Sequence, residues 1–459
     1  MTTTPKAIRK IQVHKLFGTY DYTLSPSLEA CSPERLLILY GDNGSGKTTI
    51  LKALFHLLAP EEGEGHKTIV ARIPFDRLEV EFTTGDHIWA QRPEGKTLST
   101  FTMGLRFAHK KETTVDFIAD EENAIKATSG RHDKQIKVFL AKLRDLDISL
   151  YLLSDDRTVR FAGRRPREIS FERSEALEEG FAFYQDLPPH IARARRLTDL
   201  EEQAQQLLIG SMRRAQLWIQ SQAVRGAAEG ESSVNTLYNE ILKKIFELPL
   251  QKTSETSEVR KIEEQIQTLE SRSRNYSRYG LLPEFNGKDI LSIVSNATPS
   301  QIDIVSRVLS PYLDSVEKKL DAMERLQRQI DGLVSIVNSF FTRKSLTFEI
   351  HNGFDILTED GKKLAPQMLS SGERHLLLLF CNTLIALDRP SIFMIDEPEI
   401  SLNIKWQRRL LSSLLECASD NPVQYLLATH SIELLAQQEG NVIKLSETSD
   451  VSNERKANA

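Results

Sequence analysis

A glycine-rich segment that ends in lysine and threonine carries the clearest chemical signal in the sequence. Residues 41–48 read GDNGSGKT and fit the spacing G-x-x-x-x-G-K-S/T at every position. The glycines let successive backbone N–H groups turn toward phosphate oxygens, the lysine reaches the β and γ phosphates, and the last hydroxyl can ligate Mg²⁺. An apolar run at 36–40 and a helical run at 50–55 flank the segment, as the motif requires. We therefore predict an ATP-binding loop made of Gly41, Asn43, Gly44, Ser45, Gly46, Lys47, Thr48 and Thr49.

A second apolar run ends in two neighbouring carboxylates. Residues 392–395 read IFMI and are followed by Asp396 and Glu397, the Walker B pattern. We expect Asp396 to bind Mg²⁺ together with Thr48, and Glu397 to orient or deprotonate the attacking water. Acids often follow strands, so this pair is weak evidence alone. Together with the loop at Lys47, the two acids indicate hydrolysis of ATP.

The segment Leu369-Ser370-Ser371-Gly372-Glu373 resembles the LSGGQ signature of ABC-class ATPases, with serine at the third place and glutamate at the fifth. The resemblance implies that Ser370, Gly372 and the amides at the start of their helix bind the γ-phosphate of an ATP held by a partner subunit. It therefore implies a dimer or higher homo-oligomer with composite ATP sites. An ordinary helix-capping serine would explain Ser370 equally well if the other motifs were absent.

Two more segments resemble parts of the ABC-class site. Thr429-His430-Ser431 resembles the H-loop, in which His430 contacts the γ-phosphate, so the expected catalytic residues are Lys47, Glu397 and His430. Ser401-Leu402-Asn403 stands in the place of the D-loop, with Asn403 in the place of the usual acid. No residue is assigned to the Q-loop. The segment 155–157, Asp-Asp-Arg, ends the strand expected there and is a candidate nucleotide sensor.

These motifs require an α/β fold in which several strands end at one edge. We predict an ABC-ATPase head, with a mixed sheet around the phosphate loop and an antiparallel β subdomain within 76–120, interrupted by a helical insertion with a short coiled coil. The predicted parts are 1–164 and 343–445 for the head, 165–342 for the insertion, and a polar, disordered tail at 446–459. The apolar helix after the signature is expected over 374–387, and a hairpin is expected around residues 352–353.

The predicted insertion contains apolar residues at helical spacing. They step by three and four in two series: Val259, Ile262, Ile266 and Leu269, then Leu313, Val316, Leu320, Met323, Ile330, Val334 and Val337. This stepping is typical of a coiled-coil seam, and a single amphipathic helix packed on the core explains it about as well. Even as a coiled coil, ~28 residues would reach only about 40 Å.

Composition limits the cellular compartment and the binding partners that we expect for the protein. The 459 residues carry a net charge of −5, and the three cysteines show no metal-ligand spacing, which favours a reducing cytoplasm. No apolar stretch approaches the ~20 residues of a membrane span, and the first ten residues lack a secretory core. A basic run could contact nucleic acid, although solvated charge is the favoured interpretation; it comprises Arg157, Arg160, Arg164, Arg165, Arg167, Arg193, Arg195 and Arg196.

Together the motifs resemble the SMC/RecF/OLD branch of ABC ATPases more than transporters. The ending YLLATHSIELL resembles that of OLD-family proteins, and the chain ends where their Toprim nuclease domain would begin. Its size resembles that of the ATPase subunits of the antiphage systems PARIS and Septu. This resemblance implies a sensor ATPase that controls a separate Toprim-like or HNH nuclease and answers a phage-encoded trigger. The alternative is a RecF/SMC-like repair or recombination ATPase that acts as an ATP-gated DNA clamp.

Overall fold

The computed structural model describes residues 6–26, 35–108, 110–126, 130–163, 189–230, 255–419, 421–435 and 438–445. These residues form two compact units. The first contains the described residues up to 163, those from 189 to 208 and those from 369 onward, and the second contains 209–230 and 255–368. The sequence analysis placed residues 343–368 in the head, whereas these residues belong to the second unit.

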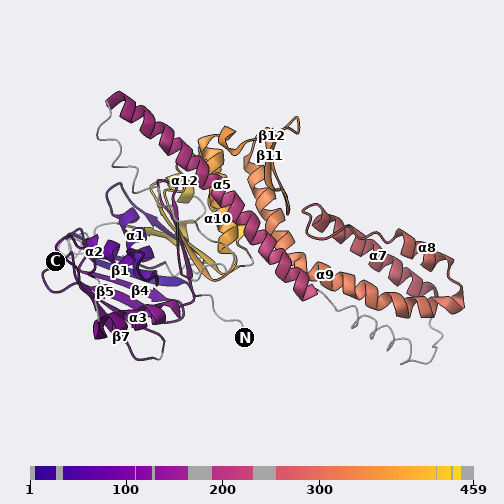
Figure 1. The fold of residues 1–459 in the computed structure, drawn as a ribbon, viewed down its shortest axis with the longest axis horizontal. Coiled ribbons are helices and arrows are strands. Elements are labelled where there is room, and N and C mark those ends of the chain that lie inside the picture. Colours follow the sequence, from indigo (N-terminus) through magenta and orange to yellow (C-terminus); the bar gives the residue numbers. More distant parts are fainter. Residues whose placement is uncertain are drawn as a thin grey trace, which may run out of the picture. The chain divides into compact units, whose positions relative to one another are not determined.

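The central sheet of the first unit places distant parts of the sequence side by side (Figure 1). Within the described residues its order is β15-β3-β14-β13-β8-β9, and only β9 pairs antiparallel. Because β3, β14, β13 and β8 run in one direction, their carboxyl ends meet at one edge. The strands are β3 (Leu36–Tyr40), β8 (Ser149–Leu153), β9 (Val159–Gly163), β13 (Ser391–Asp396), β14 (Val423–Thr429) and β15 (Val442–Lys444).

Helices cover both faces of this sheet, which is why its strands are almost wholly apolar. On one face, α1 (Lys47–Leu58) shares a hydrophobic cluster with Ile392 and Met394 of β13. On the opposite face, Tyr425 donates a hydrogen bond to the Leu414 carbonyl of α11 (Ile404–Cys417). The unit also contains α2 (His66–Arg72), α10 (Ser371–Ala386), α12 (Ile432–Leu435) and η3 (Glu439–Asn441).

A second, antiparallel sheet of the first unit has the order β2-β1-β4-β5-β6-β7. Its strands alternate between buried and partly exposed residues, as in β4, because one face packs on the core. Helix α3 (Arg131–Arg144) packs on β7. The strands are β1 (Ile8–Leu16), β2 (Tyr20–Leu24), β4 (Arg77–Phe82), β5 (His87–Gln91), β6 (Phe101–Arg106) and β7 (Thr113–Phe117). The predicted α/β fold with an antiparallel β subdomain is thus confirmed.

The second unit is mainly helical. Its helices are α5 (Pro189–Gly230) from residue 209 onward, α7 (Glu255–Ser277), α8 (Lys288–Asn296) and α9 (Pro299–Phe340). Most residues of the two predicted apolar series are buried, including Ile266 and Ile330, and α7 packs along α9. Helix α9 has 42 residues, so it is longer than the predicted stretch. The predicted hairpin is formed by β10 (Lys344–Glu349) and β11 (Gly353–Thr358), followed by β12 (Lys363–Leu364) and η2 (Pro366–Met368).

Candidate active site

The phosphate loop connects β3 to α1 and depends on two left-handed glycines. Gly44 and Gly46 both have φ of 87°, a conformation that disfavours any side chain. A Cβ on Gly46 would lie only 2.7 Å from a methyl carbon of Leu16. Lys47 is 5% exposed, and its ammonium group donates hydrogen bonds to the carbonyls of Gly41 and Asp42, 2.8 and 2.9 Å away. The lysine is therefore held within the loop that it is predicted to serve.

The two predicted magnesium ligands contact each other. The Thr48 hydroxyl donates a hydrogen bond to Asp396 Oδ1 over 3.1 Å. Burial raises the pKa of Asp396 to about 6, and the neighbouring carboxylates of Asp155 and Glu397 add to this rise. The second oxygen of Asp396 is buried and has no hydrogen-bond partner. A buried carboxylate with one unpartnered oxygen beside a hydroxyl fits a divalent cation. The ion would give the buried negative charge of Asp396 a positively charged partner.

Glu397 follows Asp396 with a positive φ of 50°, an uncommon conformation for glutamate. Its backbone N–H donates to the Ala428 carbonyl of the next strand. Its side chain meets the predicted H-loop, where Glu397 Oε2 lies 2.5 Å from His430 Nδ1. Burial, followed by the nearby Glu399, raises the pKa of Glu397, which makes its carboxylate a stronger base.

Glu399 also belongs to the site, although the sequence analysis did not select it. It is 5% exposed, and its Oε1 lies 3.4 Å from His430 Nδ1. Ligand atoms of Glu397, Glu399 and His430 all lie within 4.8 Å of one another, so these three side chains form one polar cluster. The sequence does contain a signal for Glu399, because it is a further acid two residues after Glu397 of Walker B.

The predicted signature begins α10, which starts at Ser371, three residues earlier than expected. Ser370 is the helix cap: its hydroxyl accepts a hydrogen bond from the Glu373 N–H, and the Glu373 carboxylate accepts one from the Ser370 N–H. This reciprocal pair explains the glutamate at the fifth place. Ser370 itself is exposed, and a Cβ on Gly372 would lie 2.6 Å from the Ser401 carbonyl oxygen. The glycine therefore permits close packing of the signature on the predicted D-loop.

The predicted D-loop is held from several sides. Arg157 donates a hydrogen bond of 2.6 Å to the Ser401 hydroxyl, which brings the turn after β8 to this loop. His375 of α10 hydrogen-bonds to the Pro398 carbonyl, and burial lowers the pKa of this histidine to about 4. Asn403 caps α11 by accepting a hydrogen bond from the Trp406 N–H. Asn403 thus has a structural role in place of the usual acid.

Aromatic side chains beside the phosphate loop were also missed by the sequence analysis. Phe17 is 44% exposed, and a ring carbon of Phe17 would lie 3.3 Å from a Cβ on Gly46. Tyr22 donates a hydrogen bond to the Ser45 carbonyl and stacks on Tyr20. An exposed ring next to the loop is a candidate to contact the nucleotide base. The segment FGTYDY after the first predicted strand was the sequence signal.

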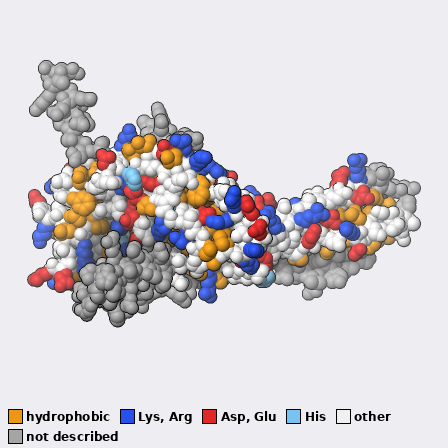
Figure 2. All heavy atoms as spheres, turned by 90° about the horizontal axis from the view of Figure 1, so that it is seen from above, with side chains coloured by type: hydrophobic (Ala, Val, Ile, Leu, Met, Phe, Trp, Pro, Cys, Tyr) orange, Lys and Arg blue, Asp and Glu red, His pale blue; other side chains and the backbone are white. Residues whose placement is uncertain are grey.

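The remaining predicted residues are less informative. Asn43 is exposed, and Thr49 is half-buried in the first turn of α1. Arg160 is exposed, whereas Arg164, Arg165, Arg167 and the side chains of Arg193, Arg195 and Arg196 lie outside the described residues. On the face shown in Figure 2, basic and acidic side chains of the described residues are interspersed. None of the described helices has the length and apolarity that crossing a membrane requires.

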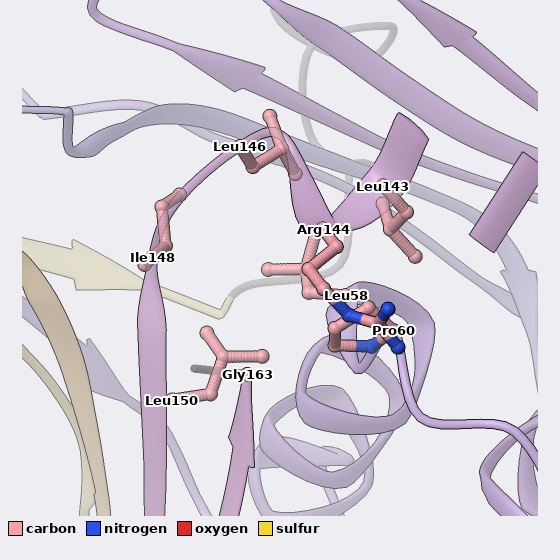
Figure 3. Close-up of a pocket in the computed structure, with 8 residues that line it drawn as sticks. All are labelled: Leu58, Pro60, Leu143, Arg144, Leu146, Ile148, Leu150 and Gly163. Carbon is pink, nitrogen blue, oxygen red and sulfur yellow. The ribbon is translucent and has the colours of Figure 1, made fainter. Parts of the chain in front are cut away.

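One pocket of the first unit is lined by eight residues, none of which belongs to these motifs (Figure 3). Apolar side chains such as Leu58, Leu143 and Ile148 line it, together with Arg144. Its volume of about 10 Å³ suits roughly one water molecule. The pocket is therefore too small for a nucleotide, and the edge where the strands end remains the candidate site.

Comparison with known proteins identifies the family of the chain. Residues 24–435 match the family model described as AAA ATPase domain. The chain belongs to the AAA ATPase domain family. Membership confirms that this protein is an ATPase, as its phosphate loop and Walker B acids predicted. The matched range extends across the helical unit as well as the head.

Individual relatives of this AAA ATPase domain protein are distant. A protein of Sulfurisphaera tokodaii, the DNA double-strand break repair Rad50 ATPase, is 30% identical over 128 residues, which are 27% of this chain and 14% of that protein. The Smc head domain with an extended coiled coil from Pyrococcus furiosus is 11% identical, with 98% of both chains covered and a TM-score of 0.39. The SMC head domain from Thermotoga maritima is 10% identical, with 94% and 91% covered and a TM-score of 0.33. Because both TM-scores are below 0.5, these two structures carry no functional inference.

Proposed function

We propose that ATP is hydrolysed where the phosphate loop, the end of β13 and the start of the H-loop meet. Lys47 neutralises the β and γ phosphates, Glu397 orients or deprotonates the attacking water, and His430 contacts the γ-phosphate. The hydrogen bond between Thr48 and Asp396 carries this proposal, because it joins Walker A to Walker B across 348 residues. Thr48 and Asp396 would hold Mg²⁺, which neutralises charge on the transferred phosphoryl group.

We further infer that each ATP site is completed by a second copy of the chain. Ser370 is exposed at the start of a 16-residue helix, whose positive end favours an anion. Gly372 packs on Ser401, so the signature and the D-loop form one surface. The resemblance to the ABC class assigns this surface to the ATP of a partner subunit. ATP then closes two heads together, and hydrolysis releases them.

The output that we propose is control of a separate nuclease in antiphage defence, with a phage-encoded trigger. The resemblance of the motifs to those of the PARIS and Septu ATPases supports this role. The helical unit offers a docking surface, because Ile293 of α8 and Ile304 of α9 are 60% and 53% exposed. Both side chains line one shallow groove, together with Ala297 and Val305. We assign this groove to the nuclease.

The test combines binding with phenotype. The protein is co-expressed with the nuclease encoded beside its gene, and both are assayed for co-purification and for defence against phage. The double substitution Ile293→Asp with Ile304→Asp should abolish co-purification and keep ATPase activity, whereas Val138→Asp, at a 55% exposed position of α3, should change neither. A nuclease-free preparation that cuts DNA or RNA would refute the role. An unchanged defence phenotype in Lys47→Ala would also refute it.

A DNA-repair ATPase that clamps DNA is the second candidate. The identity shared with the Rad50 ATPase over 128 residues favours it. The two candidates differ in how DNA affects the isolated protein. A repair clamp should bind duplex DNA with strong salt dependence and hydrolyse ATP faster on DNA. The nuclease-control role requires neither property, so DNA-stimulated hydrolysis by the isolated protein would favour the repair candidate.

A further inference from the structure

The carboxylate of Glu399 gathers hydrogen bonds from three consecutive residues at the start of the H-loop. Its Oε1 accepts a short hydrogen bond from the Thr429 hydroxyl. The same oxygen accepts hydrogen bonds of 3.2 Å from the backbone N–H groups of His430 and Ser431. These donors lie 30 to 32 residues away along the chain. Hydrogen bonds to an ionised carboxylate are stronger than neutral ones, so this contact fixes the backbone that carries His430.

The contact between Glu399 and the start of the H-loop is buried. Thr429 is fully buried and Glu399 is 5% exposed, so the carboxylate is desolvated, at a cost that its donors must offset. The other oxygen, Oε2, is buried and forms no hydrogen bond. All three donors therefore converge on one oxygen atom. An amide side chain of the same shape could supply such an oxygen, whereas alanine could not.

The backbone of Glu399 extends the link to the D-loop. Its carbonyl accepts a hydrogen bond of 2.9 Å from the Leu402 N–H. Ser401, the preceding residue, has a positive φ of 66° and is hydrogen-bonded by Arg157. One residue thus joins the loop that follows β13 to the loop that follows β14.

We propose that Glu399 is a positioning residue of ATP hydrolysis, whose carboxylate fixes the H-loop to the D-loop segment so that His430 and Glu397 keep their mutual geometry. This inference rests on the roles proposed above for Glu397 and His430. Glu399 acts as a hydrogen-bond acceptor for Thr429, His430 and Ser431 and takes no proton from the attacking water. Its loss displaces His430 and leaves the phosphate loop intact.

The test is steady-state ATP hydrolysis with separate determination of kcat and KM, together with binding of a non-hydrolysable ATP analogue. Glu399→Ala should lower kcat roughly 10- to 100-fold, because a displacement of about 1 Å can cost that much. Its KM and its affinity for the analogue should stay within about threefold of the wild type. Glu399→Gln should restore kcat to within about fivefold of the wild type, because the amide oxygen can accept the same three hydrogen bonds.

Two further variants keep the test decisive if Glu399→Ala folds poorly. Thr429→Val removes one donor at nearly constant volume and should lower kcat by a smaller factor. Glu433→Ala is the matched control, since this neighbouring glutamate forms a surface ion pair with Arg408. It should leave kcat unchanged. In the double variant Thr429→Val with Glu399→Ala, the effects should not multiply, because both substitutions break one contact.

Several results would overturn the inference. If Glu399→Gln is as inactive as Glu399→Ala, hydrolysis requires the negative charge of Glu399 and not only its hydrogen-bond acceptor oxygen. If Glu399→Ala folds and its kcat is unchanged, a positioning role is excluded. If Glu399→Ala does not fold, an unchanged kcat in Thr429→Val excludes that role. Glu397→Gln separates this failure from that of the proposed site: if Glu397→Gln is inactive and Glu399→Ala is fully active, only the present inference fails.

Discussion

Glu397 is the residue on which the proposed chemistry depends most. It lies on a strained backbone, its carboxylate contacts His430, and burial raises its pKa. Lys47 has a different role, because its ammonium group already sits against the phosphate-loop carbonyls. Binding and hydrolysis of ATP should therefore respond to different substitutions.

Glu397→Gln should bind ATP as the wild type does and hydrolyse it at least roughly 100-fold more slowly, because an amide cannot act as the base.

Lys47→Ala should weaken ATP binding at least about 30-fold, because the phosphates lose a charged donor. Removal of divalent cations with a chelator should stop hydrolysis in the wild type. Equilibrium binding and single-turnover assays separate these effects. Hydrolysis at the native rate by Glu397→Gln would show that the catalytic assignment is wrong.

The residues that the sequence predicted are those whose roles depend on local spacing. The phosphate loop lies within eight residues between a strand and a helix, so the sequence alone defines it. Glu399 was missed because its partners are 30 to 32 residues away and become neighbours only through the pairing of β13 with β14. Phe17 was missed for the same reason, since only the fold places its ring beside Gly46.

At the scale of elements, the parallel strands place the phosphate loop, Walker B and the H-loop at one edge of the sheet. Helix α10 packs on the segment that follows β13. The buried strands and the antiparallel β subdomain were predicted, because apolar runs and alternation are local patterns. Strand order was not, since β3 and β13 lie on either side of β14 across more than 350 residues of sequence. The start of α10 was misplaced by three residues because Ser370 and Glu373 cap each other.

His375 links α10 to the segment after β13 and should make the fold sensitive to acid. Burial, with the nearby Arg157, lowers the pKa of this histidine from 6.5 to about 4. Between these values the unfolded chain binds more protons than the folded chain, so stability falls as the pH falls. The free energy of unfolding should drop by about 2 kcal/mol from pH 7.5 to pH 5 because of this histidine alone.

Denaturant titrations at the two pH values test this prediction. His375→Asn will lower stability at pH 7.5, since it removes a buried ring, and the loss of stability between pH 7.5 and pH 5 should become smaller by the share that His375 contributes. His14→Asn is the control, because this histidine is 42% exposed on β1. A pH dependence that is the same in wild type and His375→Asn would contradict the assignment.

For the whole molecule, the sequence predicted an ATPase, and the family match confirms it. The two-unit organisation was predicted less well, because contacts of β10 and α9 draw the hairpin into the helical unit. Partner and trigger cannot be read from one chain, since recognition depends on a second surface. The composite ATP site is testable without the partner, because it needs only two copies of this chain.

Mixing two inactive variants tests the composite site most directly. Ser370→Arg places a bulky cation at the exposed start of α10, so each subunit should bind ATP without hydrolysing it. Lys47→Ala removes the phosphate-loop cation and leaves the signature intact. A heterodimer of the two contains one site with both a native Lys47 and a native Ser370. We predict that ATPase activity, absent in either variant alone, returns on mixing to about one quarter of the wild-type level, because half of the dimers carry one intact site of two. No recovered activity, despite subunit exchange demonstrated with differently tagged copies, would contradict the account.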